Sequence, residues 1–201
     1  MWSIIQAAGW PIWPLIVASV IALALIFERL WSLRQSAVAP AGMVDRVLAE
    51  YRQDGATPDL LRKVTAEAPL GRLLAAGLEN VRSPRPVMKE AIEEVGRIVA
   101  HDLDRFLTTL GTIAAMAPLL GLFGTVVGMI EIFGATTAVG ANPVQLAHGI
   151  SVALYNTAFG LIVAIPSMIF YRHFRAKVDA LIVEMEQQAI RLVDFAHGER
   201  H

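Results

Sequence analysis

The sequence predicts an all-α, polytopic membrane protein with three transmembrane helices, two of them extending as long helices into a cytoplasmic helical bundle. Hydrophobic residues make up 55 % of the 201 residues and charged residues 17 %, below the ~25 % of soluble domains. Lys and Arg are absent from residues 1–28 and 106–171, and the longer gap holds one acid, Glu131. Because a soluble fold needs a charged surface and a disordered chain needs little apolar surface, both classes are excluded.

Three stretches are long enough to cross a bilayer, which needs about 20 mainly apolar residues. The first stretch is predicted to be an uncleaved helix and not a signal peptide. No cation precedes Arg29, and the apolar stretch is longer than the apolar core of a signal peptide, which has about 7–15 residues. The predicted N-terminal periplasmic flank and first span occupy residues 1–30, and a cytoplasmic helical region follows over residues 31–106. The second span (107–133), a short periplasmic loop (134–146) and the third span (147–171) come next. A C-terminal cytoplasmic helix is predicted over residues 172–201.

The distribution of cations predicts the orientation. Residues 29–105 hold twelve Lys and Arg and residues 172–201 hold five, whereas the N-terminal flank and the 134–146 loop hold none. The positive-inside rule therefore places the N-terminus in the periplasm and the C-terminus in the cytoplasm. The net charge of −1 gives no reason to expect a nucleic-acid partner.

Two amphipathic helices are predicted to continue the later spans into the cytoplasm. Apolar residues recur every three or four positions through residues 86–106 and again through residues 174–195. We expect one unbroken helix over 86–133, a second that continues span three, and apolar faces that cover each other. Shorter helices fill the region before them, with a start signal at Thr57-Pro58 and an end at Gly55.

Small and hydroxyl-bearing residues form a stripe on one face of each later span, at spacings of three and four residues. Close helix packing, which small residues permit, and pore lining both explain such a stripe. Its members are Pro118, Gly121, Thr125 and Gly128 in the second span and Ala153, Thr157, Gly160 and Ala164 in the third, with Asn156 beside them.

The two threonines have two interpretations. A Thr in a membrane helix usually donates to the carbonyl three or four residues back; alternatively it faces water or an ionisable group of a partner. An acid deep in a span would normally mark the functional site, and none is present, since Glu131 lies near the outer end of its span. With no cysteine and no catalytic, nucleotide or metal-ligand motif, we expect no enzyme, no cofactor and no metal site.

Two runs resemble a known family. Residues 117–129, APLLGLFGTVVGM, and 149–166, GISVALYNTAFGLIVAIP, resemble the ExbB/TolQ/MotA proton-channel family, most nearly its ExbB members. The resemblance implies a homopentamer in the bacterial inner membrane that surrounds two copies of an ExbD-like single-span partner with a membrane aspartate. It also implies that Thr125 and Thr157 line the proton pathway, and that proton flow energises a TonB-like protein for uptake across the outer membrane.

One position departs from the pattern that the resemblance implies. Many ExbB and TolQ proteins have a glutamate where this chain has Val152. A hydroxyl relays protons through water but does not titrate near neutral pH, so the pathway here depends on an acid from the partner. Two alternatives stay open: a TolQ-like subunit that energises the Tol-Pal envelope system, and a non-conducting membrane scaffold.

Overall fold

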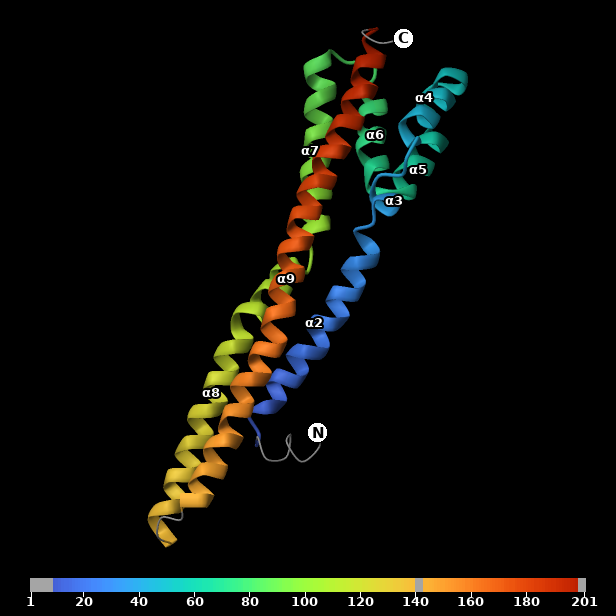
Figure 1. Ribbon diagram of the computed structural model, residues 1–201. Helices are drawn as coiled ribbons and strands as arrows, with labels where there is room; N and C mark the ends of the chain where they lie inside the picture. The colour runs from blue at the N-terminus through green and yellow to red at the C-terminus, as the bar shows by residue number, and fades with distance from the viewer. Residues whose placement is uncertain (1–8, 140–142, 199–201) are drawn as a thin grey trace. The chain divides into compact units, whose positions relative to one another are not determined.

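The computed structural model describes residues 9–139 and 143–198, and every regular element in those ranges is an α-helix (Figure 1). The all-α prediction is thus confirmed for the described residues, and three of the helices are long and apolar enough to cross a membrane. The chain forms two compact units. We call residues 1–28 with 106–173 the membrane unit, and residues 29–105 with 174–201 the charged unit.

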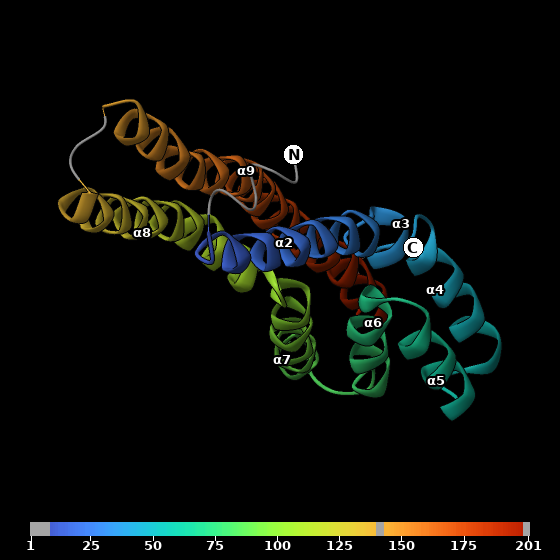
Figure 2. The ribbon, with the colours of Figure 1, turned by 90° about the horizontal axis from the view of Figure 1, so that it is seen from below.

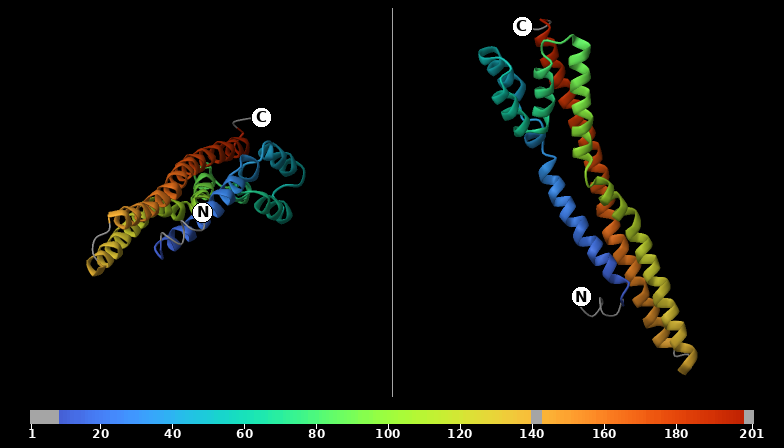
Figure 3. Two further views of the ribbon diagram at one scale, coloured as in Figure 1. Left: turned by 60° about the horizontal axis from the view of Figure 1, so that its bottom comes forward. Right: turned by 180° about the vertical axis from the view of Figure 1, so that it is seen from behind.

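Three helices build the membrane unit. They are α2 (Ile12–Ser32), α8 (Leu107–Val139) and the first part of α9 (Pro143–Ala196). α8 and this part of α9 run side by side in each view of Figures 1 and 3. Their common core joins all three helices through Leu15 of α2, Ala117 of α8, and Val163 and Ala164 of α9. Close helix packing, and not a single amphipathic face, therefore defines this unit.

The connection between α8 and α9 is shorter than the loop predicted over residues 134–146. α8 continues to Val139 and α9 begins at Pro143, and residues 140–142 lie outside the described range. The Gly, Ala and Thr residues of this segment are tolerated within a helix, and a proline is favourable at a helix's first position. Most of the predicted loop is therefore helical.

The prediction of one unbroken helix over residues 86–133 is wrong. α7 (Arg85–Asp104) ends before α8 begins, and between them Arg105 is extended while Phe106 has a positive φ of 65°. The apolar spacing runs through this point unchanged, so periodicity alone cannot detect a break two residues long. The matching prediction for span three is confirmed, because α9 is one helix of 54 residues.

Four shorter helices precede α7 in the charged unit: α3 (Gln35–Val38), α4 (Met43–Asp54), α5 (Pro58–Glu67) and α6 (Pro69–Glu79). The predicted turn signals are confirmed. The Thr57 hydroxyl accepts a hydrogen bond from the Leu60 N–H at 3.3 Å, and Pro58 is the first residue of α5. Gly55 ends α4 with a φ of 72°, a conformation that glycine adopts without cost.

The apolar faces of α7 and of the last part of α9 share a third partner, α6. A Cβ on Gly77 of α6 would lie 2.7 Å from Leu192 Cδ2 on α9 and 3.1 Å from Ile92 Cδ1 on α7. Figure 2 shows α6 and α7 side by side, joined by a short turn. The two extensions are therefore covered by a three-helix contact, where the sequence predicted a pair.

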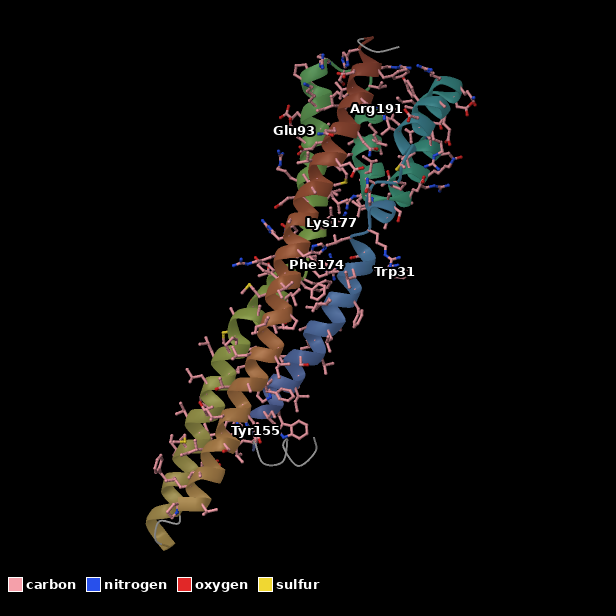
Figure 4. The ribbon with its side chains drawn as sticks, in the orientation of Figure 1. Trp31, Glu93, Tyr155, Phe174, Lys177 and Arg191 are labelled. Atoms are coloured by element: carbon pink, nitrogen blue, oxygen red, sulfur yellow. The ribbon has the colours of Figure 1, made fainter. Side chains whose placement is uncertain are left out.

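Ion pairs tie α9 to other helices of the charged unit. Arg85 of α7 donates to Asp194 at 2.9 Å, and Asp194 is 9 % exposed. Arg191, labelled in Figure 4, pairs with Asp45 of α4. A further hydrogen bond, from Arg46 to Glu67, raises the pKa of Arg46 above its ordinary value, so this guanidinium keeps its charge.

Candidate functional site

The small-residue stripes of α8 and α9 meet each other, and we call their contact, formed by Gly121, Gly124, Gly128, Ala153, Asn156 and Gly160, the α8–α9 seam. A Cβ on Gly121 would lie 2.7 Å from the Asn156 carbonyl oxygen and 3.0 Å from Thr157 Cα. A Cβ on Gly160 would lie 2.6 Å from the Ala117 carbonyl oxygen. Because real Cβ atoms essentially never approach so closely, the two backbones touch where side chains are missing.

Asn156 occupies the centre of the seam. Its residue is 1 % exposed, and a Cβ on Gly124 would lie 2.8 Å from the Asn156 Cβ and Cγ atoms. Further along, a Cβ on Gly128 would be 3.2 Å from the Ala153 Cβ. Glycine therefore leaves the space that the buried amide fills, and a polar group is held between two membrane helices.

The remaining stripe members lie in two places. Ala164 is buried in the core with Leu15 of α2, so this end of the stripe packs against a third helix. Pro118 is half-buried within α8. The structure thus brings Gly121, Gly128 and the α9 residues together and places Ala164 against α2.

Thr125 flanks the seam on α8. It is half-buried, and its hydroxyl donates to the Leu122 carbonyl oxygen three residues back at 2.6 Å. This is the local hydrogen bond that threonines in membrane helices commonly make. A shallow open depression beside it is lined by apolar side chains such as Val126 and Met129. Its hydroxyl proton is therefore already engaged within α8.

Thr157 flanks the seam on α9, next to Asn156. It is half-buried, like Thr125, but its hydroxyl makes no hydrogen bond to any residue that the structure describes. The hydroxyl is therefore available to water or to a group outside the chain. Thr125 and Thr157, each predicted as the threonine of its stripe, therefore differ in whether the hydroxyl donates a hydrogen bond within the described chain.

Titratable groups are scarce in the membrane unit. Glu131 is exposed on α8, and position 152, on α9, holds a half-buried valine. Within the described ranges no three His, Cys, Asp or Glu side chains are grouped to hold a metal ion. The seam therefore offers close packing, one buried amide and one available hydroxyl, and it has no acid of its own.

Two contacts of the seam region were not predicted from the sequence. Gly124 is not among the predicted stripe residues, yet it makes room for Asn156. Gly149 was not singled out, yet a Cβ there would lie 2.6 Å from the Ile132 side chain. The signal available was that α8 places glycines at 121, 124 and 128, spacings of three and four on one helix face.

Comparison with known proteins gives this helix pair a family. Residues 65–187, which include all of α8 and the seam, match the MotA/TolQ/ExbB proton channel family. The chain belongs to this family. The recognised resemblance is thereby confirmed, and the membership covers α6 and α7 as well as the two later spans.

Several relatives are similar over most of this chain. The putative biopolymer transport protein ExbB-like 3 of Synechocystis is 34 % identical over 168 residues, covering 81 % of this chain and 79 % of that protein. The biopolymer transport protein exbB1 of Vibrio cholerae is 31 % identical, covering 81 % and 74 %. The Tol-Pal system protein TolQ of Pseudomonas aeruginosa is 29 % identical, covering 90 % and 86 %. Family members of both the ExbB and the TolQ kind are therefore similar to this chain.

Proposed function

We propose that this chain is the pore-forming subunit of an inner-membrane, proton-driven motor of the ExbB–ExbD type, which energises TonB-dependent uptake across the outer membrane. The observation that supports it most directly is Thr157, whose hydroxyl lies at the edge of the seam with no acceptor among the described residues. Family membership supports the proton chemistry. Each proton that crosses yields about 2.3 kcal/mol per 100 mV.

No acid lies deep in α8 or in the membrane part of α9, so we infer that the motor includes a second protein that carries the titrating group. The sequence has Glu131 as its one acid between residues 106 and 171, and that residue is exposed. A titrating group must therefore come from a partner, for which a single-span protein with a membrane aspartate is suited. A homopentamer would place five copies of Thr157 around such partner helices.

Proton flux in liposomes tests the proposal. We expect gradient-driven flux when this chain is reconstituted with the single-span partner and none with either protein alone. Thr157→Val should lower the flux about tenfold, because valine cannot make the hydrogen bond that the Thr157 hydroxyl would make to water in the proton pathway. Ser151→Ala is the matched control, because Ser151 is an exposed α9 hydroxyl that already donates to the Ala147 carbonyl oxygen at 3.0 Å. Flux absent from the assembled complex would instead support a non-conducting scaffold.

A TolQ-like role is the second candidate, favoured by the Pseudomonas relative that covers 90 % of this chain. Complementation distinguishes the two systems. The chain, expressed with its partner in cells lacking their own ExbB-type protein, should restore energised uptake. Restoration of detergent resistance in cells lacking TolQ, without restored uptake, would assign it to the Tol-Pal system.

A further inference from the structure

A cavity of about 390 Å³ lies in the charged unit where the end of α2 meets the start of α6. We call it the α2–α6 pocket. Its polar lining consists of Arg29, Ser32, Arg72 and Asp102, and its apolar wall includes Val38 and Val99. The site is separate from the α8–α9 seam, because every lining residue belongs to the charged unit.

Two guanidinium groups give the α2–α6 pocket a net positive charge. Arg29 is 6 % exposed, and its Nη1 donates to the Leu103 carbonyl oxygen at 3.1 Å, which holds the side chain in place. Arg72 donates through Nη1 to Asp102 at 2.6 Å. A guanidinium has five N–H donors, so this ion pair leaves most of the Arg72 donors for another acceptor. Among the side chains that line the pocket, two guanidinium groups and one carboxylate carry a formal charge of plus one.

The Ser32 hydroxyl is the second polar feature of the pocket. Its oxygen is buried and has no hydrogen-bond partner among the described residues. By contrast, the hydroxyls of Ser151 and Ser167 each donate to the carbonyl oxygen four residues back, at 3.0 Å and 2.7 Å. A buried hydroxyl without that local bond is costly unless a ligand completes it.

The first turn of α6 also borders the pocket. Pro69 and Arg72 both line it, and α6 is an eleven-residue helix that begins with Pro69 and has no side-chain cap on Ala68. The positive end of a helix dipole favours an anion there. This contribution adds to the charge of Arg29 and Arg72, and all three favour the same sign of ligand.

The end of α2 indicates how deep in the membrane such a ligand lies. α2 is a 21-residue apolar helix, and in its last turn Trp31 is 69 % exposed (Figure 4), with the Arg34 guanidinium 4.1 Å from the centre of its ring. Trp and Arg pairs of this kind are typical of the headgroup level of a bilayer. Ser32 and Arg29 lie in the same turn as Trp31, so the pocket lies at the depth of the lipid headgroups. The abundant anions at that depth are the phosphate groups of lipids.

We propose that the α2–α6 pocket binds a phosphate group through Arg29, Arg72 and Ser32. A phosphodiester of a lipid headgroup and a free phosphate present the same chemistry to it. One singly charged phosphate neutralises the pocket, and its oxygens accept hydrogen bonds from the Arg72 guanidinium and the Ser32 hydroxyl. Bound phosphate would fasten the end of α2 to α6.

Binding to the purified full chain in uncharged detergent tests this proposal, with three probes: phosphatidylglycerol, inorganic phosphate and diacylglycerol, which lacks phosphate. We expect phosphatidylglycerol to raise the thermal unfolding temperature and diacylglycerol to leave it unchanged. A matching effect of inorganic phosphate identifies a free anion as sufficient, and its lack of effect identifies the lipid as the source. If neither phosphate compound binds, the proposal is wrong.

Variants locate the binding. Arg72→Gln should weaken phosphate binding about tenfold and Ser32→Ala about fivefold, from the loss of a charge-assisted and of a neutral hydrogen bond respectively. The paired change Arg72→Gln with Asp102→Asn leaves no unpaired carboxylate and should bind as weakly as Arg72→Gln.

The controls are Arg62→Gln and Ser36→Ala. Arg62 has a side chain 85 % exposed and pairs with Asp59, and Ser36 is exposed on α3. Both controls should bind like the wild type. Wild-type affinity in a folded Arg72→Gln/Asp102→Asn protein and in Ser32→Ala would overturn the proposal.

Discussion

The side chain of Asn156 on α9 fills the space left by Gly124 on α8. A Cβ on Gly124 would lie 2.8 Å from the Asn156 Cβ and Cγ and 3.0 Å from its Nδ2. The residue is 1 % exposed, so the amide is enclosed between the two helices. This pair is the most specific contact of the seam, because it needs glycine on one helix and a short branched amide on the other.

Gly160→Ala should destabilise the α8–α9 pair by about 1–3 kcal/mol, the usual cost of overpacking. The added methyl would lie 2.6 Å from the Ala117 carbonyl oxygen, a backbone atom that cannot rotate away. Gly134→Ala is the matched control, since a Cβ at that α8 position has nothing within 4 Å. Thermal unfolding in detergent measures both, and a Gly160→Ala protein as stable as the wild type would contradict the close contact.

Thr157→Val should lower proton flux more than Thr125→Val. The Thr125 hydroxyl already donates its proton to the Leu122 carbonyl oxygen at 2.6 Å. Its removal therefore takes away no hydrogen-bond donor that is available to water in a proton pathway. Valine keeps the size and shape of threonine, so packing at the seam is retained. Liposome flux with the single-span partner measures the order, and a larger loss for Thr125→Val would reverse the assignment.

Phe106→Gly should be more stable than Phe106→Ala by about 1 kcal/mol, because an L side chain at a left-handed φ is strained and glycine is not. Phe106 has a φ of 65°. At Ala115, an exposed position within α8, the order should be the opposite, with glycine less stable than alanine. Chemical denaturation of the two Gly/Ala pairs in detergent compares the signs, and the same sign at both positions would show that Phe106 is helical.

Asp194→Asn should destabilise the charged unit by about 1–3 kcal/mol, because it leaves the Arg85 guanidinium facing a neutral amide in a largely buried position. Asp194 is 9 % exposed, and the Arg85 Nη2 lies 2.9 Å from its Oδ1. Asp59→Asn is the control, since the Asp59 and Arg62 side chains are 90 % and 85 % exposed and such pairs contribute little. Equal effects of the two changes on thermal unfolding would contradict this view.

The sequence predicted the parts of the fold that depend on local chemistry. Thr57-Pro58 starts α5 and Gly55 ends α4, because capping and positive φ are properties of a few adjacent residues. The three membrane helices were also predictable, because the length of an apolar stretch is a property of one contiguous segment of the sequence. The break at Arg105 and Phe106 was not predictable, since the apolar spacing is the same on either side of it.

The candidate site was predictable as a set of residues but not as an arrangement. Spacing placed Gly121, Thr125 and Thr157 on helix faces, and it could not decide between packing and pore lining, because both use small residues. The difference between the two threonine hydroxyls depends on rotamers and on neighbouring carbonyls. The α2–α6 pocket joins residues far apart in the chain, so no local pattern indicates it.

The contact of Gly160 with the α8 backbone has a mechanical consequence. Where side chains separate two helices, their rotamers change and absorb small displacements. At this point a built Cβ would stand 2.6 Å from the Ala117 carbonyl oxygen and 3.1 Å from Gly121 Cα, so no rotatable group lies between the helices. We therefore expect a small shift of α9 along its axis to displace the α8 backbone at this contact, because no side chain can adjust to absorb it.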